Sequence, residues 1–231
     1  MSEIRLGGQR YLSWRSVKEA KEMEIKVYIF VVLVLPFFMV PPVAEVRADS
    51  AESREYEIKA AFLYNFARFV EWPEEKVDES SEPMTFGIIG KDPFGDAFAP
   101  LKSKRIRGRN VIIKRFGGFN GFKESSGKSK TELGLKIEAL RKCDLLFICS
   151  SEQKNLSRII SLVRRHDVLT VGGMEGFLET GGIINFLMED KKIRFEINAT
   201  AAEHAKLKLR SKLLKLARRV IEEESSDEVE S

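Results

Sequence analysis

Histidine and cysteine are scarce in this 231-residue chain, which has two of each. His166 and His204 lie in charged segments, and neither has a Cys or a second His at metal-ligand spacing. We therefore predict surface histidines, no metal site and no cofactor. The chain also lacks G-x-S-x-G, H-E-x-x-H, G-x-G-x-x-G and P-loop motifs. These absences favour a non-catalytic binding or regulatory protein. In an enzyme of unrecognised type, Asp92, Glu196 and His204 would be the first polar groups to suspect.

The two cysteines, Cys143 and Cys149, belong to the apolar segment "CDLLFICS". If this segment is a strand, the rise of roughly 3.3 Å per residue separates them by about 20 Å. A disulfide requires Cα atoms about 4.4–6.8 Å apart, so they cannot pair with each other there. We predict buried free thiols, with an intermolecular disulfide as the alternative.

Long apolar runs are confined to the amino end. After Met23 and one lysine, residues Val27–Ala44 carry no charge, and "VRA" ending at Ala48 fits a signal-peptidase site. The run is near the lower limit for a membrane span and contains three prolines. Residues 1–48 are therefore predicted to be an extension with a cleaved signal peptide, and an uncleaved anchor is the alternative. Translation could start at Met1 or at Met23.

The net charge of +4 is weak support for a nucleic-acid partner. Residues 1–48 contain seven Lys or Arg and five Asp or Glu, so cleavage leaves a net charge of +2. Export makes a nucleic-acid partner less suitable still, and we expect none. The basic run "KSKRIRGR" is predicted to be a solvated face, with a site for anionic lipid or polysaccharide as the alternative. The acidic segment 222–231 is predicted to be a disordered tail.

Residues 49–221 alternate strand and helix patterns. Strands are expected at Met84–Ile89, Val111–Arg115, 143–150, 167–171, Ile183–Met188 and Ile193–Ile197. Helices are expected from residue 54 to Pro73, over 132–142, after a capping box of Ser150 and Gln153, and from Asn198 or Thr200 onward, with a restart at Ser211. In the last helix an apolar stripe is expected at Leu213, Leu214, Leu216, Ala217 and Val220. Asp92 and Pro93 fit a further helix start.

This order predicts a single α/β domain: a layered sheet of mainly parallel strands flanked by helices, with an antiparallel hairpin near one edge. The hairpin turn is expected at residues 189–192, and Ile193, Phe195 and Ile197 should face the core.

The segment "VLTVGGMEGFLETGGIINF" contains two glycine pairs. Gly172 and Gly173 end a strand, where an open α/β sheet places its ligand crevice, and Gly181 and Gly182 precede the hairpin. We expect Phe177 to anchor the intervening loop in the core, with presentation to a partner as the alternative. Whether this loop binds a ligand or only turns the chain stays open. The candidate binding residues are Asp92, Gly95, Gly172, Gly173, Phe177, Gly181, Gly182, Glu196 and Asn198.

Several segments in fixed order resemble the YfiR family of exported regulators. They are "YEIKAAFLYNFARFVEWP", "FGIIGKDPFGDAF", "CDLLFICSSE", "VLTVGGMEGFLETGGIINFLMEDKKIRFEIN" and "SKLLKLARRV". The resemblance extends from Tyr56 to Val220. It implies a periplasmic α/β protein without known catalytic activity.

Relatives in that family repress a membrane diguanylate cyclase by binding its periplasmic portion, and release of the cyclase raises cyclic di-GMP and favours biofilm. The resemblance thus implies such a cyclase, or a similar inner-membrane sensor protein, as the partner. It also implies a homodimer and, in some members, redox control through cysteines, of which this chain has only two. A small-molecule sensor without a cyclase partner is the alternative, which keeps a small-molecule ligand among the expected partners.

Overall fold

The computed structural model describes residues 45–73, 82–122 and 130–222. The predicted apolar run of the signal peptide and nearly all of the predicted acidic tail lie outside these residues. Within the described part of the chain, no helix has both the length and the apolar character needed to cross a membrane.

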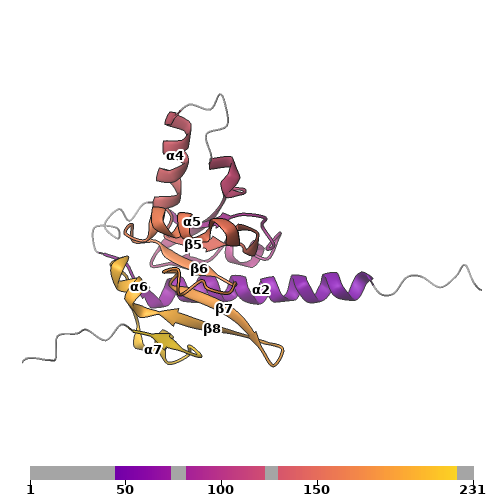
Figure 1. Cartoon of the computed structure of the whole chain (residues 1–231). Coiled ribbons are helices and arrows are strands. Elements are labelled where there is room, and N and C mark those ends of the chain that lie inside the picture. The colour runs from indigo at the N-terminus through magenta and orange to yellow at the C-terminus, as the bar shows by residue number, and fades with distance from the viewer. Residues whose placement is uncertain (1–44, 74–81, 123–129, 223–231) are drawn as a thin grey trace, which may run out of the picture. The chain divides into compact units, whose positions relative to one another are not determined.

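An eight-stranded sheet forms the centre of the domain (Figure 1). Its strands, in spatial order, are β10 (Val220–Ile221), β8 (Lys192–Asn198), β7 (Ile184–Glu189), β6 (Leu169–Gly172), β5 (Leu145–Ile148), β2 (Met84–Ile89), β4 (Arg109–Arg115) and β3 (Arg105–Ile106). The five strands from β7 to β4 are parallel, and β10 is parallel to β8. The β7–β8 and β3–β4 pairs are antiparallel. The predicted fold class, a mainly parallel sheet with a hairpin near one edge, is confirmed.

Helices cover both faces of this sheet. Helix α2 (Glu45–Phe69) packs on one face, and α4 (Lys130–Arg141) and α5 (Leu156–Val163) pack on the other. Strand β5 shows why, because its side chains alternate between the two cores: Leu145 and Phe147 face α2, whereas Leu146 and Ile148 face α4 and α5. A strand that is buried on both faces reads as a continuous apolar run, as "LLFI" does.

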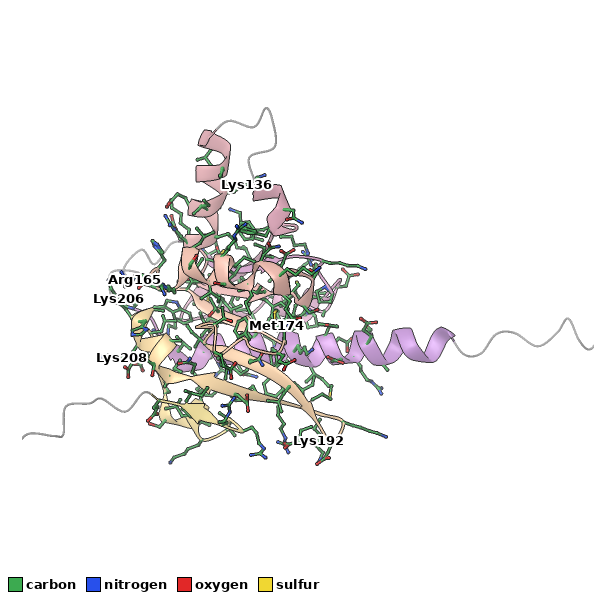
Figure 2. The ribbon with its side chains drawn as sticks, in the orientation of Figure 1. Lys136, Arg165, Met174, Lys192, Lys206 and Lys208 are labelled. Atoms are coloured by element: carbon green, nitrogen blue, oxygen red, sulfur yellow. The ribbon has the colours of Figure 1, made fainter. Side chains whose placement is uncertain are left out.

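The β7–β8 hairpin turns where predicted. Asp190 and Lys191 have φ values of 48° and 60°, so they form the two-residue loop with positive φ that matches the twist of paired strands. Phe195 and Ile197 of β8 are buried, as predicted. Lys192 lies at the outer end of the hairpin (Figure 2).

Two predicted helix starts are wrong. Residues 92–94 are not helical: Asp92 accepts a hydrogen bond from the backbone N–H of Phe94 (2.8 Å), and the chain turns before the 3₁₀ helix η2 (Ala99–Leu101). The Ser150 and Gln153 capping box does not form either. The 3₁₀ helix η4 (Ser150–Asn155) follows β5 without a side-chain cap.

The predicted carboxyl-terminal helices are wrong in extent. Asn198 does cap α6 (Ala199–His204), and Ser211 does begin α7 (Ser211–Leu214), but both helices are short. Between them, β9 (Lys208–Leu209) pairs with β1 (Val70–Glu71). Because β1 follows α2 directly, α2 ends at Phe69, before the predicted stop at Pro73. Of the predicted apolar stripe, Leu213 is buried whereas Leu216 is exposed.

Candidate functional site

A crevice of about 250 Å³ lies at the carboxyl ends of β2 and β5. Strands β2 and β5 are neighbours, and the chain leaves β2 towards β4 but leaves β5 towards β6, on the opposite side. Open α/β sheets bind ligands at such a switch point. We call this space the carboxyl-edge crevice. It is lined by Glu52, Tyr56 and Lys59 of α2, by Lys91, Asp92 and Pro93 after β2, by Phe147, Cys149, Ser150 and Ser151 around the end of β5, and by Gly173 after β6.

Asp92 is fixed in the crevice wall by a partner that the sequence did not indicate. Its carboxylate accepts hydrogen bonds from the Phe94 N–H and from the Arg115 guanidinium at the end of β4. Arg115 also donates to the Gly95 carbonyl oxygen (3.0 Å). The loop from Asp92 to Gly95 is therefore held by an arginine that lies 20 or more residues away in sequence.

The strand ends that form the crevice floor approach closely at Gly90. A Cβ there would lie 2.6 Å from the Ser151 Oγ and 2.9 Å from the Cys149 Cβ, and the φ of Gly90 is +108°. The Lys91 N–H donates to the Ser151 hydroxyl (2.9 Å), which joins the two loops. Gly90 is thus required for the crevice, although sequence reasoning gave it no role.

The α2 wall combines an aromatic ring with charges. Tyr56 packs edge-on against Phe94, and the Lys59 ammonium lies 4.6 Å from the centre of the Tyr56 ring while it pairs with Glu55. Burial, followed by the nearby carboxylates of Glu55 and Glu52, raises the pKa of Tyr56 above its ordinary value. The phenol therefore stays protonated at neutral pH and can donate a hydrogen bond into the crevice.

The surroundings of the Cys149 thiol, which borders the crevice, disfavour its ionisation. Burial, followed by the carboxylates of Asp92 and Glu152, raises the pKa of Cys149 to about 12. Nucleophilic and redox chemistry require the thiolate, which this environment disfavours. Cys143 is buried on the opposite face of the sheet, and both cysteines are free, as predicted. Neither sulfur is exposed for an intermolecular disulfide.

The glycine pairs surround Phe177, which is completely buried. A Cβ at Gly172 would lie 2.4 Å from the Phe177 ring, and a Cβ at Gly182 would lie 2.1 Å from it. The ring therefore packs directly on two stretches of backbone, and Gly181 turns the chain with a φ of +97°. Of the predicted glycines in this segment, Gly173 alone borders the carboxyl-edge crevice.

Glu196 and Asn198 of β8 do not line the crevice. Glu196 forms a two-pronged ion pair with Arg219 (3.0 Å for both contacts). Asn198 accepts from the Ala201 N–H (2.8 Å) and donates to the Leu178 carbonyl oxygen (3.0 Å). Their contacts hold α6 and the residues before β10 against the sheet.

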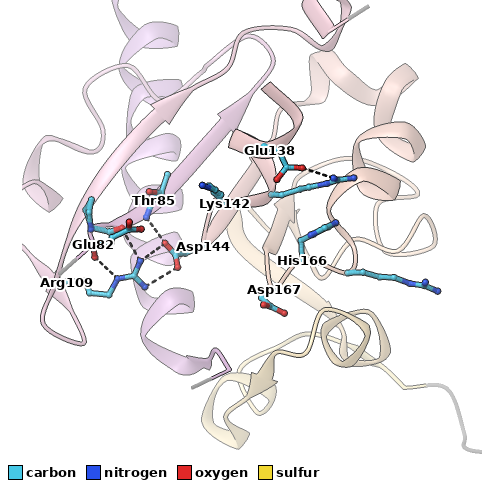
Figure 3. Close-up of a pocket in the computed structure, with 11 residues that line it drawn as sticks. Glu82, Thr85, Arg109, Glu138, Lys142, Asp144, His166 and Asp167 are labelled. Atoms are coloured by element: carbon cyan, nitrogen blue, oxygen red, sulfur yellow. Dashed lines mark hydrogen bonds and ion pairs between the residues drawn. The ribbon is translucent and has the colours of Figure 1, made fainter. Parts of the chain in front are cut away.

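A second hollow, of about 540 Å³, lies at the amino ends of the parallel strands (Figure 3). It contains a buried ion pair: two nitrogens of Arg109 each lie 3.1 Å from an oxygen of Asp144, which also accepts from the Thr85 N–H (2.7 Å). Arg109 further donates to the carbonyl oxygens of Glu82 (2.8 Å) and Pro83 (3.0 Å). Every one of these contacts joins two segments of the fold, so we assign the pair a structural role.

Few groups in the described residues could perform chemistry. Within that part of the chain, no cluster of His, Cys, Asp and Glu could hold a metal ion. His166 and His204 are exposed, as predicted. The carboxyl-edge crevice thus has hydrogen-bonding groups, charges and aromatic surface, which suit recognition.

Comparison with known proteins identifies the family. The family model described as YfiR/HmsC-like matches residues 56–218. The chain belongs to the YfiR/HmsC-like family. Membership indicates a regulatory protein of the periplasm.

Two solved structures are similar to part of this YfiR/HmsC-like chain, at low sequence identity. A conserved domain protein from Vibrio cholerae is 13% identical with a TM-score of 0.42, over 65% of this chain and 60% of the other. The ABC domain from Streptococcus pneumonia in complex with L-Trp is 11% identical with a TM-score of 0.40, over 64% of this chain and 58% of the other. The chain thus spans less than two thirds of either structure. No curated protein sequence matches it.

Proposed function

We propose that this protein is an exported, non-catalytic regulator that binds the periplasmic portion of a membrane signalling protein. By its family, the partner is a diguanylate cyclase or a similar inner-membrane sensor, which it represses, and repression lowers cyclic di-GMP and biofilm formation. The family match over residues 56–218 carries this proposal. The protonated Cys149 and the fully bonded Asp144 agree with a binding role.

A groove between α2 and the hairpin is our candidate for the partner surface. Its volume is about 410 Å³, and it is lined by Ala51, Arg54, Glu55, Ile58, Met188, Lys191, Lys192 and Ile193. Ile58 is 47% exposed and Met188 is 53% exposed. Exposed apolar side chains rimmed by charge are typical of protein interaction sites. Because the rim has three cationic side chains and one carboxylate, the groove suits an apolar segment with acidic flanks.

The test is crosslinking in intact cells that express the tagged full-length protein, with mass spectrometry of the captured inner-membrane proteins. We expect one membrane protein with a periplasmic sensor portion and a cytoplasmic cyclase domain. Ile58→Asp and Met188→Asp should abolish its capture. Leu216→Asp is the matched control, because Leu216 is exposed (63%) but lies outside the groove. Capture of no inner-membrane protein by a folded, exported bait would refute the proposal.

A small-molecule sensor is the second candidate, and the carboxyl-edge crevice favours it. The crevice lies at the switch point of the sheet and presents Lys59, Tyr56 and Asp92 to the same space. A ligand that binds only the native state raises the melting temperature by mass action. We expect a shift with at least one periplasmic metabolite, nucleotide or aromatic amino acid, and its loss in Lys59→Ala. Binding that persists in Lys59→Ala would place the ligand elsewhere.

A homodimer is also part of this proposal, on the family's example. Light scattering of the purified protein tests it, and a monomer mass at micromolar concentration would contradict it.

A further inference from the structure

Positive charge is concentrated in one hairpin of the domain. Residues 102–115 contain seven Lys or Arg and no Asp or Glu, in a chain that has 39 basic and 35 acidic residues. The segment covers the sheet edge, because β3 is the last strand and β4 is its neighbour. The segment itself therefore gives this edge of the sheet a strong positive charge.

Two of the seven cations are neutralised within the fold, since Arg109 pairs with Asp144 and Arg115 pairs with Asp92. The remaining five are all exposed, and within the described part of the chain none of them forms an ion pair. We call these five side chains the basic edge: Lys102, Lys104, Arg105, Arg107 and Lys114.

Hydrogen bonds hold the two arginines of the basic edge in place. Arg107 donates to the Val70 carbonyl oxygen (2.8 Å), and Arg105 donates to the Asn110 side-chain oxygen (3.0 Å). Each bond uses one nitrogen of a guanidinium and an uncharged acceptor, so it leaves the positive charge without a counter-charge among the described residues. These two arginines are thus preorganised, which reduces the conformational entropy that they lose on binding.

Apolar and aromatic groups lie among these cations. In β4, Val111 and Ile113 pack toward the α2 core, so Ile112 and Lys114 project from the opposite face, and Ile112 is 43% exposed. On the α2 side, the Tyr64 ring lies 5.3 Å from the Lys104 ammonium and 5.8 Å from the Arg68 guanidinium. A cationic surface with an isoleucine and a tyrosine resembles the composition of membrane-interface segments.

Protection of the sheet edge against aggregation does not explain this composition. Charged residues, lysine above all, do protect edge strands, but that protection does not need five cations along one edge. Protection also gives no reason for an exposed Ile112 between the cations. Five cations on one edge, without an ion-pair partner among the described residues, favour an anionic partner with many charges.

We propose that the basic edge docks the protein on a membrane surface of anionic phospholipids. Each Lys or Arg near such a surface contributes about fivefold to the partition coefficient, and the effect decays within a Debye length of about 10 Å at 0.1 M salt. Docking would concentrate the regulator in the plane of its membrane partner. The inference does not depend on the proposed function, because vesicles contain no partner protein.

The experiment measures partition of the protein, as recovered from the cell envelope, between buffer and lipid vesicles. The ratio of partition coefficients for vesicles with and without phosphatidylglycerol in phosphatidylcholine isolates the electrostatic contribution. The test variant is Lys102→Gln, Lys104→Gln and Lys114→Gln together. The control variant is Lys206→Gln, Lys208→Gln and Lys212→Gln, which removes the same charge from three exposed lysines. They lie after α6, in β9 and in α7, and Figure 2 labels the first two.

We expect the test variant to lose about a hundredfold in that ratio, since each lysine contributes about fivefold, and the control to lose less than about fivefold. The binding should also disappear when the salt concentration rises to about 1 M. Equal losses in the two variants, or no preference of the wild type for phosphatidylglycerol, would overturn the proposal. So would strong binding to soluble dextran sulfate with none to vesicles, because that result indicates a polysaccharide site.

Discussion

At the scale of single residues, the Phe177 ring packs directly on the backbone of two glycines. The slot for this ring exists because Gly172 and Gly182 have no side chains. The sequence left open whether the segment with the two glycine pairs binds a ligand or only turns the chain. In the structure, one glycine of each pair packs against the same aromatic ring. The sequence contains Phe177 between the pairs, but only the fold brings Gly172 and Gly182 to opposite sides of its ring.

We predict that Gly182→Ala destabilises the domain by about 1–3 kcal/mol, because the new methyl group overlaps the Phe177 ring. The midpoint of urea unfolding measures this change. Gly134→Ala is the matched control: its Cβ meets no atom within 4 Å in α4, so it should gain about 0.5–1 kcal/mol. Combining Gly182→Ala with Phe177→Leu should recover part of the loss. A Gly182→Ala midpoint equal to that of the wild type would contradict the packing role.

We predict that Cys149 resists alkylation in the native protein. Its pKa is raised to about 12, so the native thiol keeps its proton at pH values where an unfolded thiol, of ordinary pKa 9.0, loses it. Stability from this site is therefore complete below about pH 9 and declines as the pH rises from about 9 to about 12. Iodoacetamide labelling of a Cys143→Ala variant at pH 8, with and without urea, measures the protection. Equal labelling rates in the two states would contradict it, and Cys149→Ala should make the decline of stability with pH smaller.

At the scale of elements, the sequence predicted those whose pattern is local and missed those fixed by distant partners. Met84–Ile89 is a strand in the structure, because a short apolar run between polar flanks suffices to bury it. The carboxyl-terminal segment has helical periodicity, but α6 ends at His204, because the chain after it pairs Leu209 with Val70. A backbone partner 139 residues away in sequence leaves no local signal. Asp92 was likewise taken for a helix cap, whereas Arg115 engages it in a loop.

The Arg109–Asp144 pair joins elements in the same non-local way, since it connects the starts of β4, β2 and β5. We predict that Asp144→Asn costs about 3–5 kcal/mol, because it leaves a guanidinium that is nearly buried without its counter-charge. Glu138→Gln, which breaks the more exposed pair with Arg141, should cost less than about 1 kcal/mol. Urea unfolding at constant pH compares the two. If Asp144→Asn shifts the midpoint no more than Glu138→Gln does, the pair does not hold these strands together.

At the scale of the whole molecule, the order of the central strands and the helices that cover them was predictable, and the sites were not. Alternating apolar segments fix a parallel sheet with two covered faces, and the position of a crevice at its carboxyl edge follows from that topology. The crevice walls do not follow, because Tyr56 and Lys59 come from a helix whose docking angle no sequence pattern specifies. Of the nine candidate residues, Asp92 and Gly173 line the crevice because they follow the carboxyl ends of β2 and β6. Glu196 and Asn198 lie elsewhere.

The strand order also separates the two proposed binding surfaces, since the basic edge lies on β3 and β4, and the apolar groove involves β7 and β8. Four strands divide β3 from β7, so a substitution on one surface should not disturb the other. Met188→Asp should abolish partner capture and leave vesicle binding unchanged. The triple lysine variant of the basic edge should lose vesicle binding and keep the partner contacts.

This separation predicts different responses to protein level in the cell. A regulator that no longer docks on the membrane is present at lower local concentration, so overexpression of the triple lysine variant should restore repression. A regulator without its apolar contact has lost affinity itself, so overexpression of Met188→Asp should restore little. Cyclic di-GMP measured across a range of expression levels distinguishes the two responses. Parallel behaviour of the two variants would show that membrane docking and partner binding are a single event on a single surface.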